Sequence, residues 1–292
     1  AALTGADFHL PEDKVLADGA DVTGRVRIEI QEPDLNPRFV LGLLEDIEIK
    51  PSPYQIQRRL RLAGVRPINN IVDATNYAML EIGEPLHAFE YDILRRRAGG
   101  HAPTISTRPA QQGEKLTTLD GIERTLDDFS VLVCDTAGSL SIAGVMGGLE
   151  SEVTEQTRNV LLEGAAWNYI NVRRTVNAQN LPSEAAYRFS RGVHPELAPQ
   201  GVRRGLVDVA GRRGNERGVG GQAVADQGVG RGEGGAVVAI AQRIFQPIAG
   251  CGVRSIDGLL NAEWADHDPG AIARCKAVVV IDAGGLSCIA VF

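Results

Sequence analysis

Short runs of hydrophobic residues, separated by glycine, proline and polar turn residues, follow one another through the first 200 residues of the chain. Continuous apolar runs of this length are typical of buried strands, and they occur at residues 38–44, 131–135, 140–145 and 159–165. The segments 115–119 and 122–126 flank Asp120-Gly121, a pair that favours a type I′ turn, so we expect a β-hairpin there.

Helical patterns are fewer. Ser52 is expected to cap a helix that has Pro53 at its first position and continues over residues 54–63. A second helix is expected to begin within residues 73–77, and a third to span residues 169–178. Because strands outnumber helices, we expect an α+β fold with mixed sheets and packed helices.

The composition changes near residue 200, because 12 of the 34 glycines fall in the segment 201–235. Such a stretch buries too little apolar surface to offset its ordering entropy, which predicts linker or disorder. Two later apolar runs, at residues 236–240 and 277–281, fit either a buried strand or a helix. We therefore divide the chain into three parts. Residues 1–33 are a remnant of a preceding domain and a linker, residues 34–197 are one folded domain, and residues 198–292 are a glycine-rich tail that we interpret as non-native.

Charge and cysteine content limit the functional classes. The net charge of −7 and the pI of about 5.4 confine any RNA contact to a local surface or to one completed by a partner chain. Without a Cys-x-x-Cys pair or a histidine cluster, the cysteines are expected to be free thiols in a reducing cytoplasm: Cys134, Cys251, Cys275 and Cys288. No apolar run approaches the roughly 18 residues of a membrane span, and we expect no signal peptide. A first residue other than methionine leads us to expect a fragment.

Short motifs do not name an activity, because the chain has no phosphate-binding Gly-Lys-Ser/Thr loop, no Gly-x-Ser-x-Gly and no His-Glu-x-x-His. Longer phrases do. In their order along the chain they resemble the central editing domain of bacterial phenylalanyl-tRNA synthetase beta chains: RRLRLAGVRPINNIVDATNY (58–77), EPLHAF (84–89), GEKLTTLDG (113–121), AGVMGG (143–148), SEVT (151–154), NVLLEGA (159–165), YRF (187–189) and RGV (191–193). The resemblance covers roughly residues 34–197, and it departs from the family at residues 180–186, at His194 and beyond about Glu196.

The resemblance implies hydrolysis of the ester that joins tyrosine wrongly to the phenylalanine tRNA. Tyrosine exceeds phenylalanine by one hydroxyl, and a second site that demands this hydroxyl can correct the error. The resemblance places the hydroxyl-binding carboxylate at Glu163 and the substrate-facing wall at Gly144, Gly147 and Ala165. A carboxylate that ends an apolar run is costly to bury unless it is paired, and the phenol of tyrosine can donate to it.

The same resemblance implies a catalytic polar cluster around the ester at Thr75, Asn76 and His87. A histidine with a near-neutral pKa can orient or deprotonate water. No metal ligand and no cofactor are expected for this step. For the complete synthetase the resemblance implies ATP and magnesium, the phenylalanine tRNA, and an alpha subunit in a heterotetramer that carries the aminoacylation site.

Each of these residues has a structural alternative. Glu163 can be a strand-end carboxylate paired with an arginine, and His87 can be a packed core histidine. Thr75 and Asn76 can cap a helix, and the glycines can serve a tight turn. Four arginines can face RNA phosphates or be solvated and ion-paired: Arg173, Arg174, Arg188 and Arg191. Two other functional readings remain open, a non-catalytic tRNA-binding or scaffold module and an inert fragment.

Overall fold

A computed structural model describes residue 22 and residues 24–211, 222–228 and 236–237. Its helices are α1 (Tyr54–Leu62), α2 (Asn70–Ile82), α3 (Tyr91–Arg97), α4 (Tyr169–Gln179), α5 (Glu184–Phe189) and α6 (Leu197–Gly211), with a 3-10 turn η1 (Leu149–Ser151). Its strands are β1 (Arg27–Ile30), β2 (Arg38–Leu44), β3 (Leu86–Glu90), β4 (Thr104–Pro109), β5 (Lys115–Thr117), β6 (Glu123–Thr125), β7 (Val131–Asp135), β8 (Gly138–Ile142), β9 (Met146–Gly147), β10 (Val160–Ala166), β11 (Gln222–Gly228) and β12 (Ala236–Val237).

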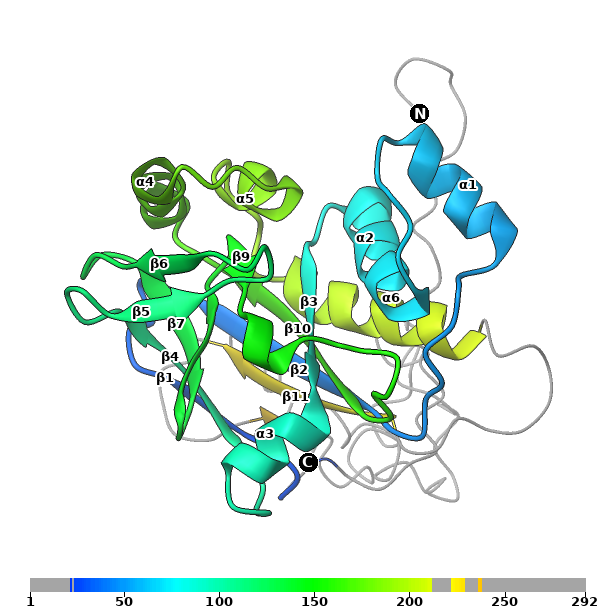
Figure 1. The fold of residues 1–292 in the computed structure, drawn as a ribbon, viewed down its shortest axis with the longest axis horizontal. Helices are drawn as coiled ribbons and strands as arrows, with labels where there is room; N and C mark the ends of the chain where they lie inside the picture. Colours follow the sequence, from blue (N-terminus) through cyan, green and yellow to red (C-terminus); the bar gives the residue numbers. More distant parts are fainter. Residues whose placement is uncertain (1–21, 23, 212–221, 229–235, 238–292) are drawn as a thin grey trace, which may run out of the picture.

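Two five-stranded sheets form the framework (Figure 1). The first sheet has the order β12-β11-β2-β10-β3 and is antiparallel throughout. The second has the order β1-β4-β7-β8-β9, and only its β1–β4 pair is parallel. Strands β5 and β6 form a separate hairpin. This arrangement of mixed sheets and packed helices confirms the predicted α+β class.

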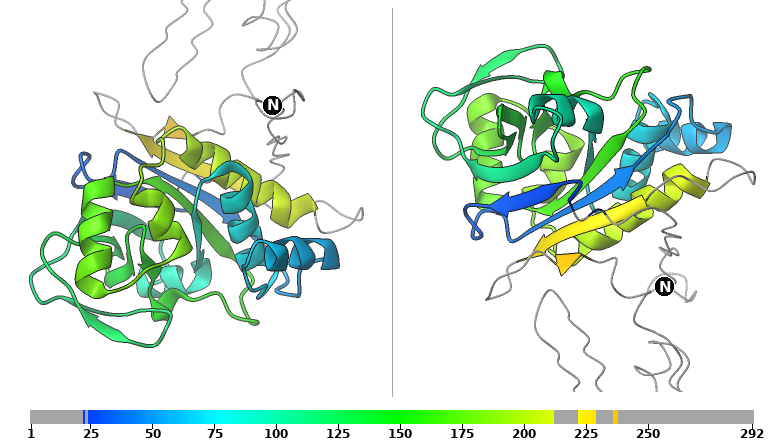
Figure 2. Two further views of the ribbon diagram at one scale, coloured as in Figure 1. Left: turned by 90° about the horizontal axis from the view of Figure 1, so that it is seen from above. Right: turned by 90° about the horizontal axis from the view of Figure 1, so that it is seen from below.

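Helices cover one face of the first sheet, and the second sheet lies toward the other face (Figures 1 and 2). Helices α2 and α6 pack against each other and against strands β3, β10 and β2. The apolar cluster beneath them includes Val40, Leu162 and Val202. On the opposite face a larger cluster, which includes Phe39 and Trp167, fills the space between the two sheets and helices α4 and α5. Strands β2 and β10 are buried at every position because they are covered on both faces.

Glycines on these two central strands allow α6 to approach the sheet closely. A Cβ atom at Gly42 would lie 2.7 Å from Val202 Cγ1. A Cβ atom at Gly164 would lie 2.8 Å from the carbonyl oxygen of Ala198. Real Cβ atoms do not make such contacts, so the helix can sit at this distance only over glycine.

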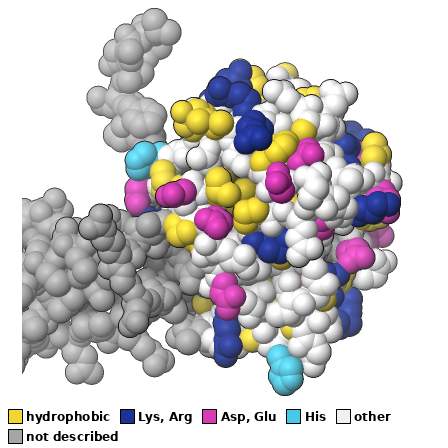
Figure 3. All heavy atoms as spheres, turned by 90° about the vertical axis from the view of Figure 1, so that its left-hand side faces the viewer, with side chains coloured by type: hydrophobic (Ala, Val, Ile, Leu, Met, Phe, Trp, Pro, Cys, Tyr) yellow, Lys and Arg dark blue, Asp and Glu magenta, His cyan; other side chains and the backbone are white. Residues whose placement is uncertain are grey.

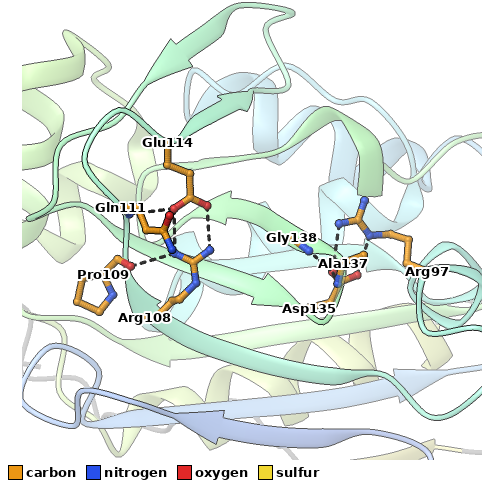
Figure 4. Close-up of polar contacts among 8 residues, drawn as sticks. All are labelled: Arg97, Arg108, Pro109, Gln111, Glu114, Asp135, Ala137 and Gly138. Atoms are coloured by element: carbon orange, nitrogen blue, oxygen red, sulfur yellow. Dashed lines mark hydrogen bonds and ion pairs between the residues drawn. The ribbon is translucent and has the colours of Figure 1, made fainter.

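Two bidentate ion pairs hold the second sheet at its ends (Figure 4). Arg97 Nε donates to Asp135 Oδ2 at 2.7 Å, and the Asp135 carboxylate also accepts from the backbone N–H of Gly138 in the β7–β8 turn. Arg108 donates from both Nη atoms to Glu114, at 2.9 and 2.8 Å, which lowers the pKa of that carboxyl below its usual range.

Two predicted helix starts are wrong. Helix α1 begins at Tyr54 with Pro53 as its N-cap, and Ser52 Oγ is buried without a hydrogen-bond partner instead of capping the helix. Helix α2 begins at Asn70, before the predicted residues 73–77, because the side chain of Asn69 accepts from the N–H groups of Ile71 and Val72 and caps the helix there. The predicted helix over residues 169–178 is confirmed as α4.

Two predicted strand features also differ. The strand expected over residues 140–145 ends at Ile142, because Gly144 has a φ of +68° that breaks the extended backbone before β9. The hairpin of β5 and β6 is confirmed, but its turn is not type I′. That turn requires positive φ at two residues, and of Asp120 and Gly121 only Gly121 has it. The predicted strands at residues 38–44, 131–135 and 159–165 are confirmed as β2, β7 and β10.

Regular structure continues past residue 197. Helix α6 extends into the segment 201–235 as far as residue 211, and strand β11 lies within it at residues 222–228. The interpretation of the segment as linker or disorder stays a prediction. The domain boundary at residue 197 remains a prediction. The apolar run at residues 277–281, the end of the run at residues 236–240, and Cys251, Cys275 and Cys288 lie outside the described residues. Cys134 is a buried free thiol, and burial raises its pKa to about 11.

Candidate functional site

Glu163 and His87 are direct cross-strand neighbours. In the antiparallel pair of β10 and β3, Glu163 lies opposite His87, and on the other side of β10 it lies opposite Leu41 of β2. Directly opposite residues of antiparallel strands point to the same face, with Cβ atoms about 4.5–5.5 Å apart. The sheet therefore brings together two residues that are 76 positions apart in the sequence, on the face toward the second sheet.

The Glu163 carboxyl is buried without a full set of partners. Glu163 is 6% exposed, and its Oε2 atom has no hydrogen-bond partner. Burial in apolar surroundings disfavours the charged form and raises the pKa of Glu163 to about 8. A buried carboxyl in this state is an acceptor that a donor on a ligand can satisfy.

The imidazole of His87 is fixed by an aromatic ring and by a glycine. It packs edge-to-face on Phe89, with ring centroids 4.5 Å apart. A Cβ atom at Gly147 would lie 2.4 Å from His87 Cε1, so only glycine allows the β9 backbone to lie against this ring. Desolvation lowers the pKa of His87 to about 4, which keeps the imidazole neutral at neutral pH.

The glycine loop, residues 143–148, joins this pair to helix α5. Gly144 has a left-handed backbone, and a Cβ atom there would lie 2.8 Å from Trp167 Cδ1 and 3.1 Å from Phe189 Cδ2. The N–H of Gly148 donates to the carbonyl oxygen of Leu140 at 2.7 Å. Loop geometry and close packing thus both require glycine here, so the turn and the wall readings of these glycines are compatible.

The remaining predicted residues lie at two different places. Ala165 lies on β10 two positions after Glu163, so its side chain is on the same face, opposite Phe39 of β2. Thr75 and Asn76 lie on α2. The Thr75 hydroxyl donates to the carbonyl oxygen of Val72 in its own helix, at 2.8 Å. Among the described residues, no hydrogen bond joins Thr75 or Asn76 to His87 or Glu163. The structure therefore brings the carboxylate, the histidine and the glycines together, and it joins the threonine and the asparagine to them by no such bond.

Sequence reasoning missed a second buried carboxyl, Glu84. It is fully buried, its Oε1 accepts from the N–H of Ala165 at 3.2 Å, and its Oε2 has no partner. Burial raises the pKa of Glu84 well above its usual range, and the charge of Glu163 raises it further. In the sequence, Gly83-Glu84-Pro85 is typical of an exposed turn. Burial arises only because α6 closes over it, where a Cβ atom at Gly201 would lie 2.4 Å from Glu84 Cγ.

Neither a cluster of metal-binding side chains nor a candidate membrane-spanning helix is found in the described part of the chain. It holds no group of three or more His, Cys, Asp or Glu side chains placed to bind a metal ion. None of its helices combines the length and the apolar character needed to cross a bilayer.

These features define an α+β domain in which a buried carboxyl lies on the strand beside a neutral imidazole, and the imidazole lies against a glycine loop. The chain belongs to the B3/4 domain family, whose profile matches residues 35–206. Its curated relatives include beta subunits of phenylalanine–tRNA ligase, which confirms the resemblance found in the sequence. The relative from Moorella thermoacetica is 48% identical over 216 residues, which cover 73% of this chain and 26% of the relative.

A second relative and a solved structure are also similar to this chain. The beta subunit from Symbiobacterium thermophilum is 43% identical over 228 residues, which cover 73% of this chain and 25% of that protein. The chain thus spans about a quarter of the length of these relatives. A crystal structure of an N-terminal fragment of the phenylalanyl-tRNA synthetase beta-subunit from Pyrococcus horikoshii aligns with a TM-score of 0.39 at 18% identity, and covers 64% of this chain and 54% of that one.

Proposed function

We propose that this domain hydrolyses the ester that joins tyrosine wrongly to the phenylalanine tRNA. The observation that carries the proposal is the position of the Glu163 carboxyl beside the His87 imidazole, which lies against Gly147. Such a site needs a carboxyl that selects the substrate hydroxyl and a neutral base that orients the attacking water.

Selection for tyrosine rests on Glu163. The phenol of a bound tyrosine donates to the carboxyl oxygen that has no partner in the protein. Phenylalanine offers no donor, so its binding leaves the buried carboxyl unsatisfied, which disfavours the complex. In this proposal Gly144, Gly147 and Ala165 form the wall beside the ring, because none of them carries a long side chain.

In the proposed hydrolysis, water attacks the carbonyl carbon of the ester. The bond between that carbon and the ribose oxygen breaks, and the products are tyrosine and a tRNA with a free terminal hydroxyl. With a pKa of about 4, His87 accepts a hydrogen bond from the water and orients it, and it holds a proton only briefly. Thr75 and Asn76 contribute polar contacts to the ester and the amino group, and the neighbouring ribose hydroxyl assists the proton transfer.

In the complete protein this domain is proposed to be part of the beta subunit of a phenylalanine-tRNA ligase in the cytoplasm. Aminoacylation then belongs to the assembly with an alpha subunit, and it uses ATP and magnesium. For the editing reaction of this domain we propose no magnesium-dependent step and no cofactor.

Deacylation of tyrosyl-tRNA and phenylalanyl-tRNA by the same protein tests the proposal. Glu163→Ala should lower kcat/KM for the tyrosyl ester about 100-fold or more and leave the slow phenylalanyl reaction nearly unchanged. His87→Ala should lower turnover about 100-fold. The matched controls Glu29→Ala and His101→Ala remove exposed residues of the same types and should leave both reactions unchanged. Equal losses for the two esters in Glu163→Ala would refute selection by the carboxyl.

A non-catalytic tRNA-binding or scaffold module is the second candidate. It is favoured by one observation, that the Thr75 hydroxyl is bonded within its own helix and not to the Glu163–His87 pair. Binding of tRNA with no hydrolysis of either ester, in the unaltered chain, would support this candidate over editing.

A further inference from the structure

Helices α4 and α5 and the turn after them, residues 169–193, differ in charge from the rest of the chain. This segment, the arginine–tyrosine surface, contains four arginines and one acidic residue, whereas the whole chain has a net charge of −7. On the upper part of the face in Figure 3, where α4 and α5 lie, basic and hydrophobic side chains lie next to one another. A local basic surface on an acidic protein favours a partner with a phosphate backbone.

The arginines of this surface are placed over aromatic rings. The guanidinium of Arg191 lies 3.5 Å from the centroid of the Tyr187 ring, and that of Arg173 lies 5.5 Å from the Tyr169 ring. Arg174 stacks in the same way on Phe129, at 4.2 Å. Such stacking pre-orients the guanidinium groups and keeps them at the surface.

Hydrogen bonds to the protein leave most donors of these arginines available. Arg173 donates to the carbonyl oxygen of Ser190 from Nη2, and Arg191 donates to that of Tyr187 from Nη1. A guanidinium group carries five N–H donors, so each retains donors for a phosphate. The one acidic residue, Glu184, is engaged by Arg188 at 2.8 Å.

Two tyrosine rings on the same surface are open to solvent. Tyr169 is 46% exposed and Tyr187 is 57% exposed, and Ile170 beside them is 54% exposed. Exposed aromatic rings among arginines are the combination that holds unpaired bases, because bases stack on rings while phosphates contact the guanidinium groups. The surface therefore fits a single RNA strand better than a duplex or an acidic peptide.

The arginine–tyrosine surface lies one loop away from the candidate site. Phe189 of α5 packs on Gly144, and Ser183, which caps α5, donates to the carbonyl oxygen of Val145 at 2.9 Å. Both contacts are made to the glycine loop, whose Gly147 lies against His87. A strand bound across α4 and α5 would thus end near the Glu163–His87 pair.

We propose that α4 and α5 bind the single-stranded end of the tRNA and present its terminal ester to the site. This inference rests on the proposed function for its choice of RNA. Arg173, Arg174 and Arg191 contact the phosphates, and Tyr169 and Tyr187 stack on the unpaired bases.

Fluorescence anisotropy with 5′-labelled phenylalanine tRNA, at several salt concentrations, tests the surface in the full chain. Arg173→Gln with Arg191→Gln should weaken binding about 10-fold near 0.1 M salt. It should also lower the slope of log Kd against log salt by about 1.4, the value for two single-strand phosphate contacts. The matched control, Arg95→Gln with Arg96→Gln, removes two exposed arginines from α3 and should change neither quantity.

Two further measurements separate base stacking from charge and from folding. Tyr169→Ala with Tyr187→Ala should weaken binding about 10-fold without changing the salt slope, whereas Tyr54→Ala on α1 should have no effect. Removing the unpaired 3′ nucleotides from the tRNA should abolish the difference between the unaltered chain and these variants. Arg173→Lys with Arg191→Lys keeps both charges, so it should keep the salt slope. This variant replaces the glutamine variant in the comparison if the glutamine variant does not fold.

The outcomes distinguish this surface from the proposed hydrolysis. Binding that responds to the arginine and tyrosine variants, in a chain that hydrolyses neither ester, supports the surface and contradicts editing. Hydrolysis with the same kcat/KM in the unaltered chain and in both double variants supports editing and overturns the surface. Salt slopes equal to that of the Arg95 and Arg96 control also overturn it.

Discussion

At the scale of single residues, burial decides the chemistry of the site. Glu163 and Glu84 each keep one carboxyl oxygen without a partner in the protein, and desolvation lowers the pKa of His87 to about 4, so its imidazole is neutral at neutral pH. The sequence phrases pointed to Glu163 and His87, whereas Glu84 lies in a phrase that is typical of an exposed turn. Burial depends on what packs over a residue, so local sequence could not reveal that Glu84 is a core residue.

The raised pKa of Glu163 predicts a stability that falls with pH. Between pH 4.5 and about 8 the folded carboxyl keeps its proton while the unfolded one ionises, so stability is lost as the pH rises through this window. His87 has the opposite sign, but most of its contribution is complete by pH 6.5, and the remainder is the same in both proteins. Chemical denaturation at pH 6.5 and pH 8 should therefore show a loss that is about 1.5 kcal/mol smaller in Glu163→Gln than in the unaltered chain.

The exposed carboxylate of Glu29 provides the control for this measurement. Glu29→Gln should show the same loss between the two pH values as the unaltered chain. Glu84 remains in every variant and titrates in the same direction as Glu163, so some loss persists in Glu163→Gln. An identical loss in the unaltered chain and in Glu163→Gln would mean that the Glu163 carboxyl is already ionised in the folded protein.

At the scale of elements, register and close packing decide which residues meet. Predicting β10 as a strand was possible from its apolar run, but its pairing with β3, which sets Glu163 opposite His87, was not. Helix α6 carries Val202, Leu206 and Val209 at helical spacing, a signal that was present in the sequence. Its glycines hid that signal, because glycine disfavours helices in general. Here Gly201 and Gly205 permit contact with the sheet.

The contact between α6 and β2 predicts a coupled effect of two substitutions. Gly42→Ala alone should lower the free energy of unfolding by about 1–3 kcal/mol, because the new methyl group overlaps Val202 Cγ1. Val202→Ala alone should also destabilise, by about 2 kcal/mol, because it removes buried methyl groups. The double variant relieves the overlap. Its loss of unfolding free energy should therefore be smaller than the sum of the two single losses by at least about 0.5 kcal/mol, which is roughly the smallest coupling expected between contacting residues. Urea denaturation of the four proteins measures this coupling, and strict additivity would show that the helix does not lie against Gly42.

At the scale of the whole molecule, the two sheets and the helices between residues 22 and 211 share two apolar clusters. The family match, which ends at residue 206, includes most of α6. Strand β11 continues the first sheet beside β2, so the sheet is completed by residues that follow the helix. The long phrases in the sequence identified the family, and the apolar runs indicated the α+β class, but the high glycine content after residue 200 hid the helix and the strand that follow.

Truncation tests the predicted boundary at residue 197. A chain ending there lacks three buried side chains of α6 and the pairing of β11 with β2: Val202, Leu206 and Val209. Each large buried side chain contributes about 2–5 kcal/mol, and a domain is stable by only about 5–15 kcal/mol. Residues 1–197 should therefore show no cooperative thermal transition by circular dichroism, whereas residues 1–228 should. A transition at the same temperature in both would place the end of the domain at residue 197 after all.

The sequence by itself determined the family, the α+β class and most strands, and it predicted the carboxylate, the histidine and the glycines of the site. These follow from local apolar runs, from turn residues and from phrases whose order is fixed along the chain. Only the tertiary structure decided that Glu163 faces His87, that Glu84 is sealed beneath α6, and that α5 packs on the glycine loop. Strand register, burial and helix–sheet distance depend on residues far apart in the chain, and no local pattern records them.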